Sequence, residues 1–172
     1  MRLATIVTLI ILALDQALKW AVVVGLNLSE VLYIEVSPPW LNLTMAWNRG
    51  VNFGLFADDS VWLRFALVAL AVVVTGWVWF WVRREGARPA MQIALGFLAG
   101  GALGNAIDRL VWGAVADFLN VSCCGIENPY AFNIADVAIF AGAIGLVIFD
   151  ARKPAAKSRR GNKTRDGGKS TR

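Results

Sequence analysis

The chain has 172 residues, of which 58% are hydrophobic and 17% charged, with a mean hydropathy of +0.58 and a net charge of +5. Soluble domains are about half apolar and about a quarter charged, so this much apolar surface requires the bilayer as its solvent. The chain contains no histidine, which excludes Ser-His and Cys-His nucleophile chemistry and the usual zinc sites. Its two cysteines, Cys123 and Cys124, are adjacent and do not make a disulfide framework.

Four apolar runs, each close to the roughly 20 residues that cross a bilayer, predict transmembrane helices at about 3–24, 61–82, 91–111 and 132–149. The first run reaches Asp15 and Lys19 without a small-residue cleavage site, so we expect a retained helix and not a cleaved signal peptide. The predicted fold class is an all-α membrane protein, with one membrane domain over residues 1–152.

The segment at about 30–57, between the first two runs, carries a period-two pattern. Apolar and polar residues alternate in LNLTMAW, residues 41–47, which favours a β-strand. Pro38-Pro39 precedes this stretch and Asn48-Arg49-Gly50 follows it, and both are turn signals. We therefore expect a small β-sheet on the outer membrane face.

Basic residues are distributed unevenly along the chain. Nine of the 17 lysines and arginines follow Asp150. If the chain crosses the membrane four times, these nine lie on the same side of the membrane as Arg2, Arg83, Arg84 and Arg88. The positive-inside rule makes that side cytoplasmic, with both termini inside. The basic tail, residues 153–172, has the composition of a disordered segment, and behind a membrane helix we expect it to contact anionic lipid and not nucleic acid.

Four carboxylates are predicted at a similar depth, near the outer face. Asp15 lies past the midplane of the first helix, Asp108 near the outer end of the third, Asp136 about one turn into the fourth, and Asp117 in the outer loop or at the membrane boundary. Ionisable groups in a membrane are costly and usually functional. Two close carboxylates share one proton, so the ionised one can take a proton from water while the other donates to a substrate carbonyl. Such a pair hydrolyses peptides without a metal or a cofactor.

Small residues and amides accompany these acids. Gly100, Gly101 and Gly104 permit close approach between helices. Asn105 precedes Asp108 by three residues, as Asn133 precedes Asp136. Buried amides beside carboxylates usually hydrogen-bond a partner or a bound peptide backbone.

Each acid also has a structural interpretation. Asp15 and Lys19 are spaced i, i+4 and can neutralise each other. Asp108 and Arg109 can form an interfacial pair, Asp136 can complement a helix dipole, and Asp117 can be an ordinary loop acid. Two other functions stay open: a small proton-coupled transporter, and a non-enzymatic assembly factor acting through its tail. A transporter would need midplane carboxylates and an inverted repeat, whereas these acids cluster near the outer face and no repeat is visible.

Five short blocks occur in order along the chain: DQALK (15–19), NRGVNFG (48–54), GGALGNAIDR (100–109), VADF (115–118) and FNIAD (132–136). Together they resemble the signature blocks of the lipoprotein signal peptidase family, also called signal peptidase II or prolipoprotein signal peptidase. The resemblance implies an aspartic endopeptidase of the bacterial inner (cytoplasmic) membrane, active near the outer, periplasmic face. It would cleave diacylglyceryl-modified prolipoproteins N-terminal to the lipidated Cys.

By position in the blocks, Asp117 and Asp136 match the family's catalytic pair. The positions that match its supporting and substrate-facing residues are Asp15, Lys19, Asn48, Gly50, Gly101, Asn105, Asp108, Arg109, Asn133 and Ala135. The resemblance also implies membrane lipid and globomycin-type inhibitors as partners, and no cofactor or metal. We expect the outer sheet to clamp the substrate by strand addition. The adjacent cysteines and the basic tail fall outside the family's pattern.

Overall fold

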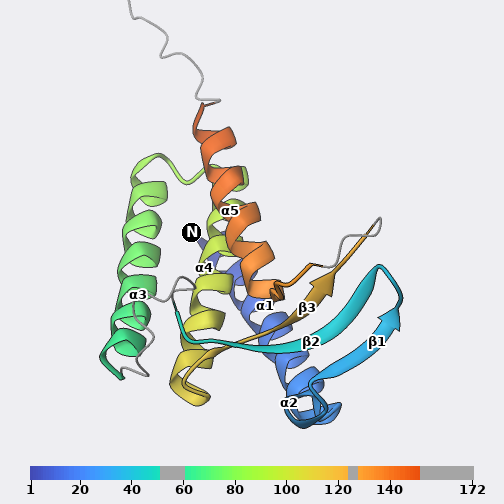
Figure 1. Cartoon of the computed structure of the whole chain (residues 1–172). Helices are drawn as coiled ribbons and strands as arrows, with labels where there is room; N and C mark the ends of the chain where they lie inside the picture. Colours follow the sequence, from blue (N-terminus) through green and yellow to red (C-terminus); the bar gives the residue numbers. More distant parts are fainter. Residues whose placement is uncertain (51–60, 124–127, 152–172) are drawn as a thin grey trace, which may run out of the picture.

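Four long helices form a bundle, and a small sheet lies across one of its ends (Figure 1). The computed structural model describes residues 1–50, 61–123 and 128–151. In this part of the chain the long helices are α1 (Arg2–Lys19), α3 (Val61–Arg84), α4 (Pro89–Val111) and α5 (Ile134–Ala151). A π-helical segment, η1 (Trp20–Gly25), continues α1, and the short helix α2 (Leu28–Val31) follows.

All four long helices have the length and hydropathy of a membrane span, with mean hydropathies of 1.4 to 2.2 over their most apolar stretches. The predicted fold class, four transmembrane helices with a small sheet, is confirmed. Part of the expected outer β segment, residues 51–60, and the whole basic tail from residue 153 lie outside the described residues.

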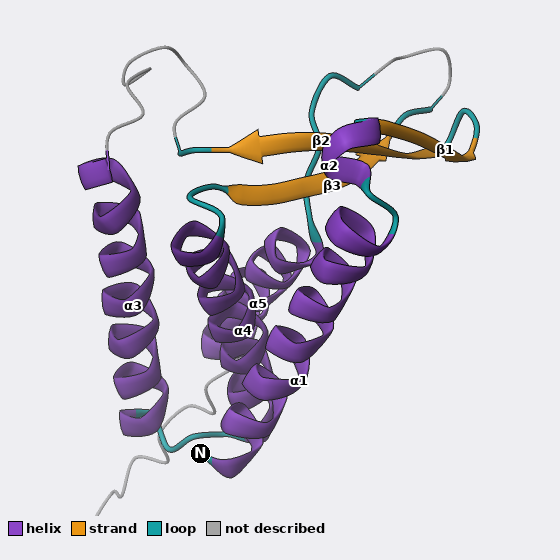
Figure 2. Cartoon of the chain, turned by 90° about the horizontal axis from the view of Figure 1, so that it is seen from below, coloured by secondary structure: helices purple, strands orange, loops and turns teal. Residues whose placement is uncertain are grey.

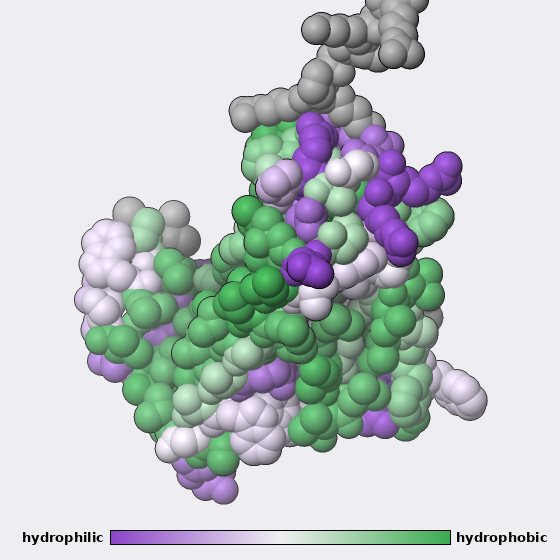
Figure 3. Space-filling model, turned by 180° about the vertical axis from the view of Figure 1, so that it is seen from behind, coloured by the Kyte–Doolittle hydropathy of each residue, from purple (hydrophilic) through white to green (hydrophobic). Residues whose placement is uncertain are grey.

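The central helix of the bundle is α4, which packs on α1, α3 and α5. Of its most apolar stretch 56% is buried, against 17% for α3. The other helices turn large apolar side chains outward, among them Trp77, Phe140 and Val147, and Figure 3 shows this apolar surface running over the helices. A surface of this kind is stable where lipid covers it.

Glycines let α4 approach its neighbours closely near the sheet end. A Cβ on Gly104 would lie 2.5 Å from Oδ2 of Asp15 on α1. A Cβ on Gly101 would collide with the backbone carbonyl oxygen of Ala135 at the start of α5. The small residues read from the sequence therefore act as predicted, and they bring three helix segments together around one point.

The sheet has three antiparallel strands, β1 (Tyr33–Ser37), β2 (Leu41–Asn48) and β3 (Val115–Val121), in the order β1-β2-β3. Figure 2 shows it lying across the ends of α1, α4 and α5. Its apolar face packs on the end of the first span, in a cluster of buried residues made of Val22, Leu28, Leu43 and Phe118. The segment expected to be a strand is β2, whereas β3 was expected to be part of an outer loop.

The β2–β3 ladder shifts register by one residue between Leu43 and Ala46. Leu43 lies opposite Leu119, but Ala46 lies opposite Asp117. Because side chains alternate faces along a strand, the extra residue on β2 turns Asn48 to the face that carries Asp117. The alternation read from the sequence therefore ends at this bulge, and the bulge places Asn48 beside the acid.

Candidate active site

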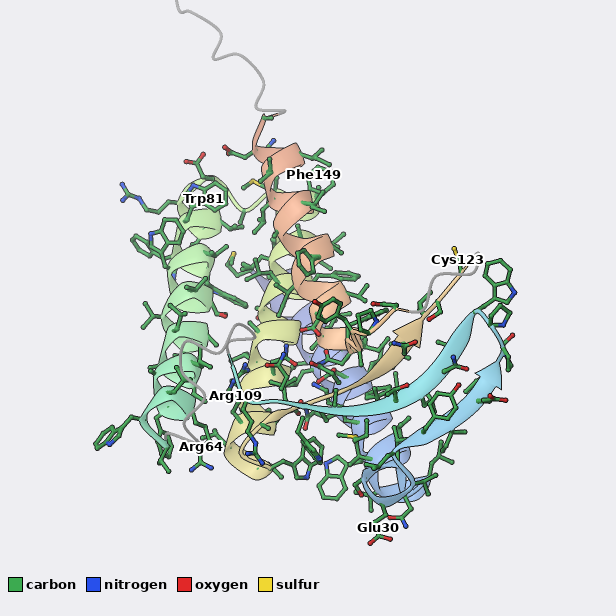
Figure 4. All side chains as sticks on the ribbon, viewed as in Figure 1. Glu30, Arg64, Trp81, Arg109, Cys123 and Phe149 are labelled. Carbon is green, nitrogen blue, oxygen red and sulfur yellow. The ribbon has the colours of Figure 1, made fainter. Side chains whose placement is uncertain are left out.

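The four predicted acids meet where the sheet covers the bundle. Asp15 comes from α1, Asp108 from the last turns of α4, Asp117 from β3, and Asp136 from the first turn of α5. Asp15, Asp108 and Asp117 are buried, and Asp136 is partly exposed. Figure 4 labels Arg109 at the sheet end of the bundle and Trp81 and Phe149 at the opposite end.

Lys19 is the cation at the centre of the cluster. Its Nζ lies 2.9 Å from Asp15 Oδ2 and 2.6 Å from Asp108 Oδ2, and it donates to Asn105 Oδ1 at 3.1 Å. The three side chains of the ion pairs have no exposed surface. The pairing of Asp15 with Lys19 expected from their spacing is therefore present, but Lys19 also binds Asp108. Arg109, for which an interfacial pair with Asp108 was one interpretation, donates to the backbone oxygen of Asn105 at 3.1 Å.

Asn133 connects the two acids of the predicted catalytic pair. It precedes the first residue of α5, and its Oδ1 accepts the Asp136 N–H at 3.0 Å while its own N–H donates to Asp136 Oδ2 at 3.2 Å. This reciprocal pair has the form of a capping box and satisfies free N–H groups at the helix start. The Asn133 Nδ2 also donates to Asp117 Oδ1 at 2.6 Å. Asn133 thus donates to both carboxylates, from its side-chain amide to Asp117 and from its backbone N–H to Asp136.

Each of these two carboxylates accepts a further amide. Asn48 on β2 donates from Nδ2 to Asp117 Oδ2 at 3.1 Å. Asn105 on α4 donates from Nδ2 to Asp136 Oδ1 at 2.8 Å. Amide groups orient carboxylates without adding charge, so the two acids keep their mutual repulsion.

The environment of Asp117 favours its protonated form. The pKa of Asp117 is raised to about 6, mainly by burial and also by the charge of Asp136, while the hydrogen bonds from Asn48 and Asn133 and the charge of Lys19 oppose the rise. A carboxyl with this pKa exchanges a proton readily near neutral pH, as general acid–base catalysis requires.

The remaining predicted positions support the shape of the site. Gly50 has φ of +129°, a conformation that favours glycine, and its N–H donates to Asn48 Oδ1 at 3.1 Å. Ala135 donates its N–H to Asp15 Oδ1 at 3.1 Å. Gly101 allows the start of α5 to pack on α4. Every predicted site residue therefore lies in this cluster or contacts one of its members.

Two features of the site were not singled out in the sequence. Gln16, next to Asp15, donates from Nε2 to Asp108 Oδ1 at 2.9 Å and to Asp15 Oδ2 at 3.2 Å. The backbone N–H of Ala116 donates to Asp108 Oδ2 at 3.3 Å. The contacts of Gln16 and of Ala116 with Asp108 join residues of different elements, so the sequence alone does not show them.

A lateral cavity of about 240 Å³ opens beside the site, between α3, α4 and α5. Its lining is apolar except for Arg109, and includes Leu67, Val74, Leu98 and Ile139. Among the described residues, no group of three or more His, Cys, Asp or Glu side chains is arranged to hold a metal ion.

Comparisons with known proteins place this arrangement in a family. Residues 7–151 match the sequence model described as signal peptidase (SPase) II. The chain is 40% identical over 157 residues to a lipoprotein signal peptidase of Methylorubrum extorquens strain PA1, covering 91% of this chain and 90% of the relative. It is 42% identical over 164 residues to a lipoprotein signal peptidase of Methylobacterium radiotolerans, covering 93% and 92%.

A solved structure agrees with this assignment. A bacterial membrane enzyme determined by the in meso method superposes with a TM-score of 0.72 at 25% identity, over 93% of this chain and 94% of that chain. The sequence match runs through all the elements that carry the cluster of acids, from α1 to α5. The resemblance read from the five blocks is confirmed, and the chain belongs to the signal peptidase II family of membrane peptidases.

Proposed function

We propose that this protein is an aspartic endopeptidase that cleaves the signal peptide from diacylglyceryl-modified prolipoproteins, N-terminal to the lipidated Cys. The observation that carries the proposal is the pair of carboxylates, Asp117 and Asp136, joined by Asn133 and oriented by two further amides. The raised pKa of Asp117 supports the sharing of one proton between them.

The proposed reaction needs one proton on the pair. The ionised carboxylate takes a proton from a water molecule, and the hydroxide formed attacks the carbonyl carbon of the scissile peptide bond. The protonated carboxyl gives its proton to the carbonyl oxygen. When the tetrahedral intermediate breaks, the C–N bond cleaves and the carboxyl that took the proton from water gives it to the Cys nitrogen. The other, now ionised carboxylate takes a proton from one hydroxyl of the intermediate, which restores one proton to the pair and leaves a free carboxyl on the signal peptide and a free amine on the lipidated Cys.

The surroundings of the pair suit a lipid-anchored substrate. An apolar cavity reaches Arg109 from the side of α3 and α5, where an apolar signal peptide would enter from the bilayer. The sheet lies over the same end of the bundle, and β1 is an edge strand of this sheet, which suits addition of a substrate strand. The supporting residues hold the pair in place, and inhibitors of the globomycin type would occupy the same site.

The proposed location is the bacterial inner membrane, with both termini cytoplasmic and the site at the outer face. Arg83 and Arg84 end α3 and Arg88 precedes α4, so these arginines lie at the end of the bundle opposite the sheet. At the sheet end, the ring of Trp112 lies 5.7 Å from that of Trp20 and 6.0 Å from that of Trp47. Basic residues inside and an aromatic cluster at the outer interface are the usual pattern.

The test is cleavage of a purified diacylglyceryl prolipoprotein by single Asn variants. Asp117→Asn and Asp136→Asn are each expected to lose cleavage while the protein inserts and folds, because Asn cannot exchange a proton with water. The double variant is expected to be scarcely worse than either single one, since residues that act as a unit lose their effect together. Asp150→Asn, at the far end of α5, is the matched control and should cleave normally.

Inhibitor and chelator experiments complete this test. Globomycin should stop cleavage by the wild-type enzyme, and chelators should leave it unchanged. A folded Asp117→Asn or Asp136→Asn variant with near-normal turnover contradicts the proposal, as does restoration of a chelated enzyme by a divalent metal. A membrane protein that folds but never cleaves the lipidated substrate points to the transporter or assembly-factor alternatives.

A further inference from the structure

The alanine that precedes each proposed catalytic aspartate is held by a buried carboxylate from a different helix. Ala116 donates its N–H to Asp108 Oδ2 at 3.3 Å, and Ala135 donates its N–H to Asp15 Oδ1 at 3.1 Å. Neither alanine has any exposed surface. Each alanine is joined by a peptide bond to the proposed catalytic aspartate that follows it. A shift of the N–H of either alanine therefore also moves the carboxyl group of that aspartate.

The two carboxylates that bind these alanines are both contacted by side chains from one turn of α1. Lys19 Nζ contacts Asp15 at 2.9 Å and Asp108 at 2.6 Å. Gln16 Nε2 contacts the same two residues at 3.2 and 2.9 Å and also the backbone oxygen of Gly104 at 3.3 Å. An amide nitrogen has two hydrogens, so three acceptors require that one hydrogen be shared.

The charge balance explains why an amide suits this position. Two buried carboxylates share the ammonium of Lys19, where the effective dielectric constant is low. A neutral amide supplies hydrogen bonds to both carboxylates without changing the total charge. An apolar side chain at Gln16 would leave Lys19 as the side chain that bridges the two carboxylates, which repel each other.

We propose that Gln16 is a positioning residue, which together with Lys19 fixes the carboxylates of Asp15 and Asp108 and through them the backbone of both catalytic aspartates. The inference rests on the proposed function for its consequence in catalysis. One turn of α1 thereby sets the relative position of β3 and α5, the two elements that carry the pair. Misplacement of reacting groups by about 1 Å costs on the order of 100-fold in rate.

Kinetics provide the first test. Gln16→Met keeps the length of the side chain and removes the amide. It is expected to lower kcat about 10- to 100-fold with KM for the lipidated substrate within about twofold, because the pair is displaced and the substrate contacts are not. The matched control is Gln92→Met on α4. The amide of Gln92 joins α1 and α4 at the opposite end of the bundle, so this variant should keep the wild-type kcat per folded molecule.

Hydrogen exchange provides a test that does not depend on turnover. Enzyme labelled with ¹³C-carbonyl isoleucine and ¹⁵N-alanine gives two Ile–Ala amide signals, Ala94 and Ala135, and the corresponding valine label gives Ala69, Ala116 and Ala138. In Gln16→Met, exchange of both Ala116 and Ala135 should be at least about tenfold faster, with the other amides unchanged. In Gln92→Met both should exchange at the wild-type rate.

The outcomes separate the inference from the proposed function. Unchanged exchange at Ala116 and Ala135 in Gln16→Met, or exchange that changes at only one of them, overturns the inference even if turnover falls. Faster exchange at both supports it, even if the Asp→Asn variants disprove the catalytic pair. Where Gln16→Met does not accumulate, Gln16→Asn replaces it, because its shorter amide cannot reach both carboxylates and should change both amides in the same direction.

Discussion

At the scale of single residues, the site combines charges with neutral amides. Lys19 neutralises part of the buried negative charge, while Asn48, Asn105 and Asn133 orient the acids. Amides leave the repulsion between the two acids in place, and that repulsion adds to burial in raising the pKa of Asp117 to about 6. The titration of Asp117 therefore affects stability as well as the proposed catalysis.

The pH dependence of stability follows from the raised pKa of Asp117, about 6 against an ordinary 3.8. The folded protein binds this proton more tightly than the unfolded chain, so the free energy of unfolding falls as the pH rises from about 4 through about 6. Asp117→Asn removes this titration. Thermal unfolding in detergent from pH 4 to 8 should show the melting temperature of the variant rising relative to that of the wild type as the pH increases. A difference that stays constant over this range contradicts the shift.

Asn133 is expected to act through two separable contacts. Asn133→Ala removes the cap of α5 and the donor to Asp117, so it should lose about 1 kcal/mol of stability together with most of the activity. Asn133→Ser keeps a capping oxygen but lacks the amide donor, so its melting temperature should recover and its kcat should not. Recovery of kcat in Asn133→Ser means that the donor to Asp117 is dispensable.

At the scale of the elements, α4 organises the site because it is the helix that the others share. Its glycines face Asp15 on α1 and the start of α5, and its last turns supply Asn105 and Asp108. The bulge in β2 has a similar role in the sheet, since it turns Asn48 toward Asp117. Close packing and register, and not the strength of single bonds, set which side chains meet here.

Gly104→Ala tests the close packing of α4 on α1. Its methyl group would lie 2.5 Å from Asp15 Oδ2 and must displace this buried carboxylate, so both melting temperature and turnover per folded molecule should fall. The control is Gly76→Ala in α3, where a Cβ meets nothing within 4 Å and which should be neutral or slightly stabilising. Unchanged turnover in Gly104→Ala means that the Asp15 carboxylate can move without affecting the site.

At the scale of the whole molecule, the apolar surface of the helices and the two ends of the helix bundle define how the protein sits in a membrane. The sheet covers one end, and the N-terminus, the α3–α4 connection and the end of α5 lie at the other (Figure 2). A membrane peptidase whose substrate is anchored by lipid needs its catalytic pair close to the lipid headgroups. The proposed orientation meets this need, because the pair lies beneath the sheet.

Reporter fusions test the orientation. Alkaline phosphatase fused within the segment Gly25–Ser60 should be active and a fusion at the C-terminus inactive, because segments rich in basic residues stay on the cytoplasmic side of the membrane. A cytoplasmic reporter at the same sites should give the opposite pattern. Phosphatase activity at the C-terminus would place the sheet and the proposed catalytic pair on the cytoplasmic side, away from the lipidated Cys.

The sequence by itself determined the number of spans, the strand at β2 and the family. These follow from local properties: an apolar run must be long enough to cross the bilayer, period-two alternation suits a strand, and the five blocks are contiguous residues. The same blocks named the residues of the candidate site, and the structure brings those residues together around Lys19 and Asn133.

Only the tertiary structure decided how these residues contact one another. Strand β3 was missed because its stretch, VADFLNV, lacks alternation and its partner, β2, lies about 70 residues earlier in the chain. The bulge beside Asn48, the second ion pair of Lys19 and the role of Gln16 depend on how α1, α4 and the sheet pack. The contact of Gln16 with Asp108 joins residues 92 positions apart. Such contacts are set by close packing, which cannot be predicted from the spacing of residues along the chain.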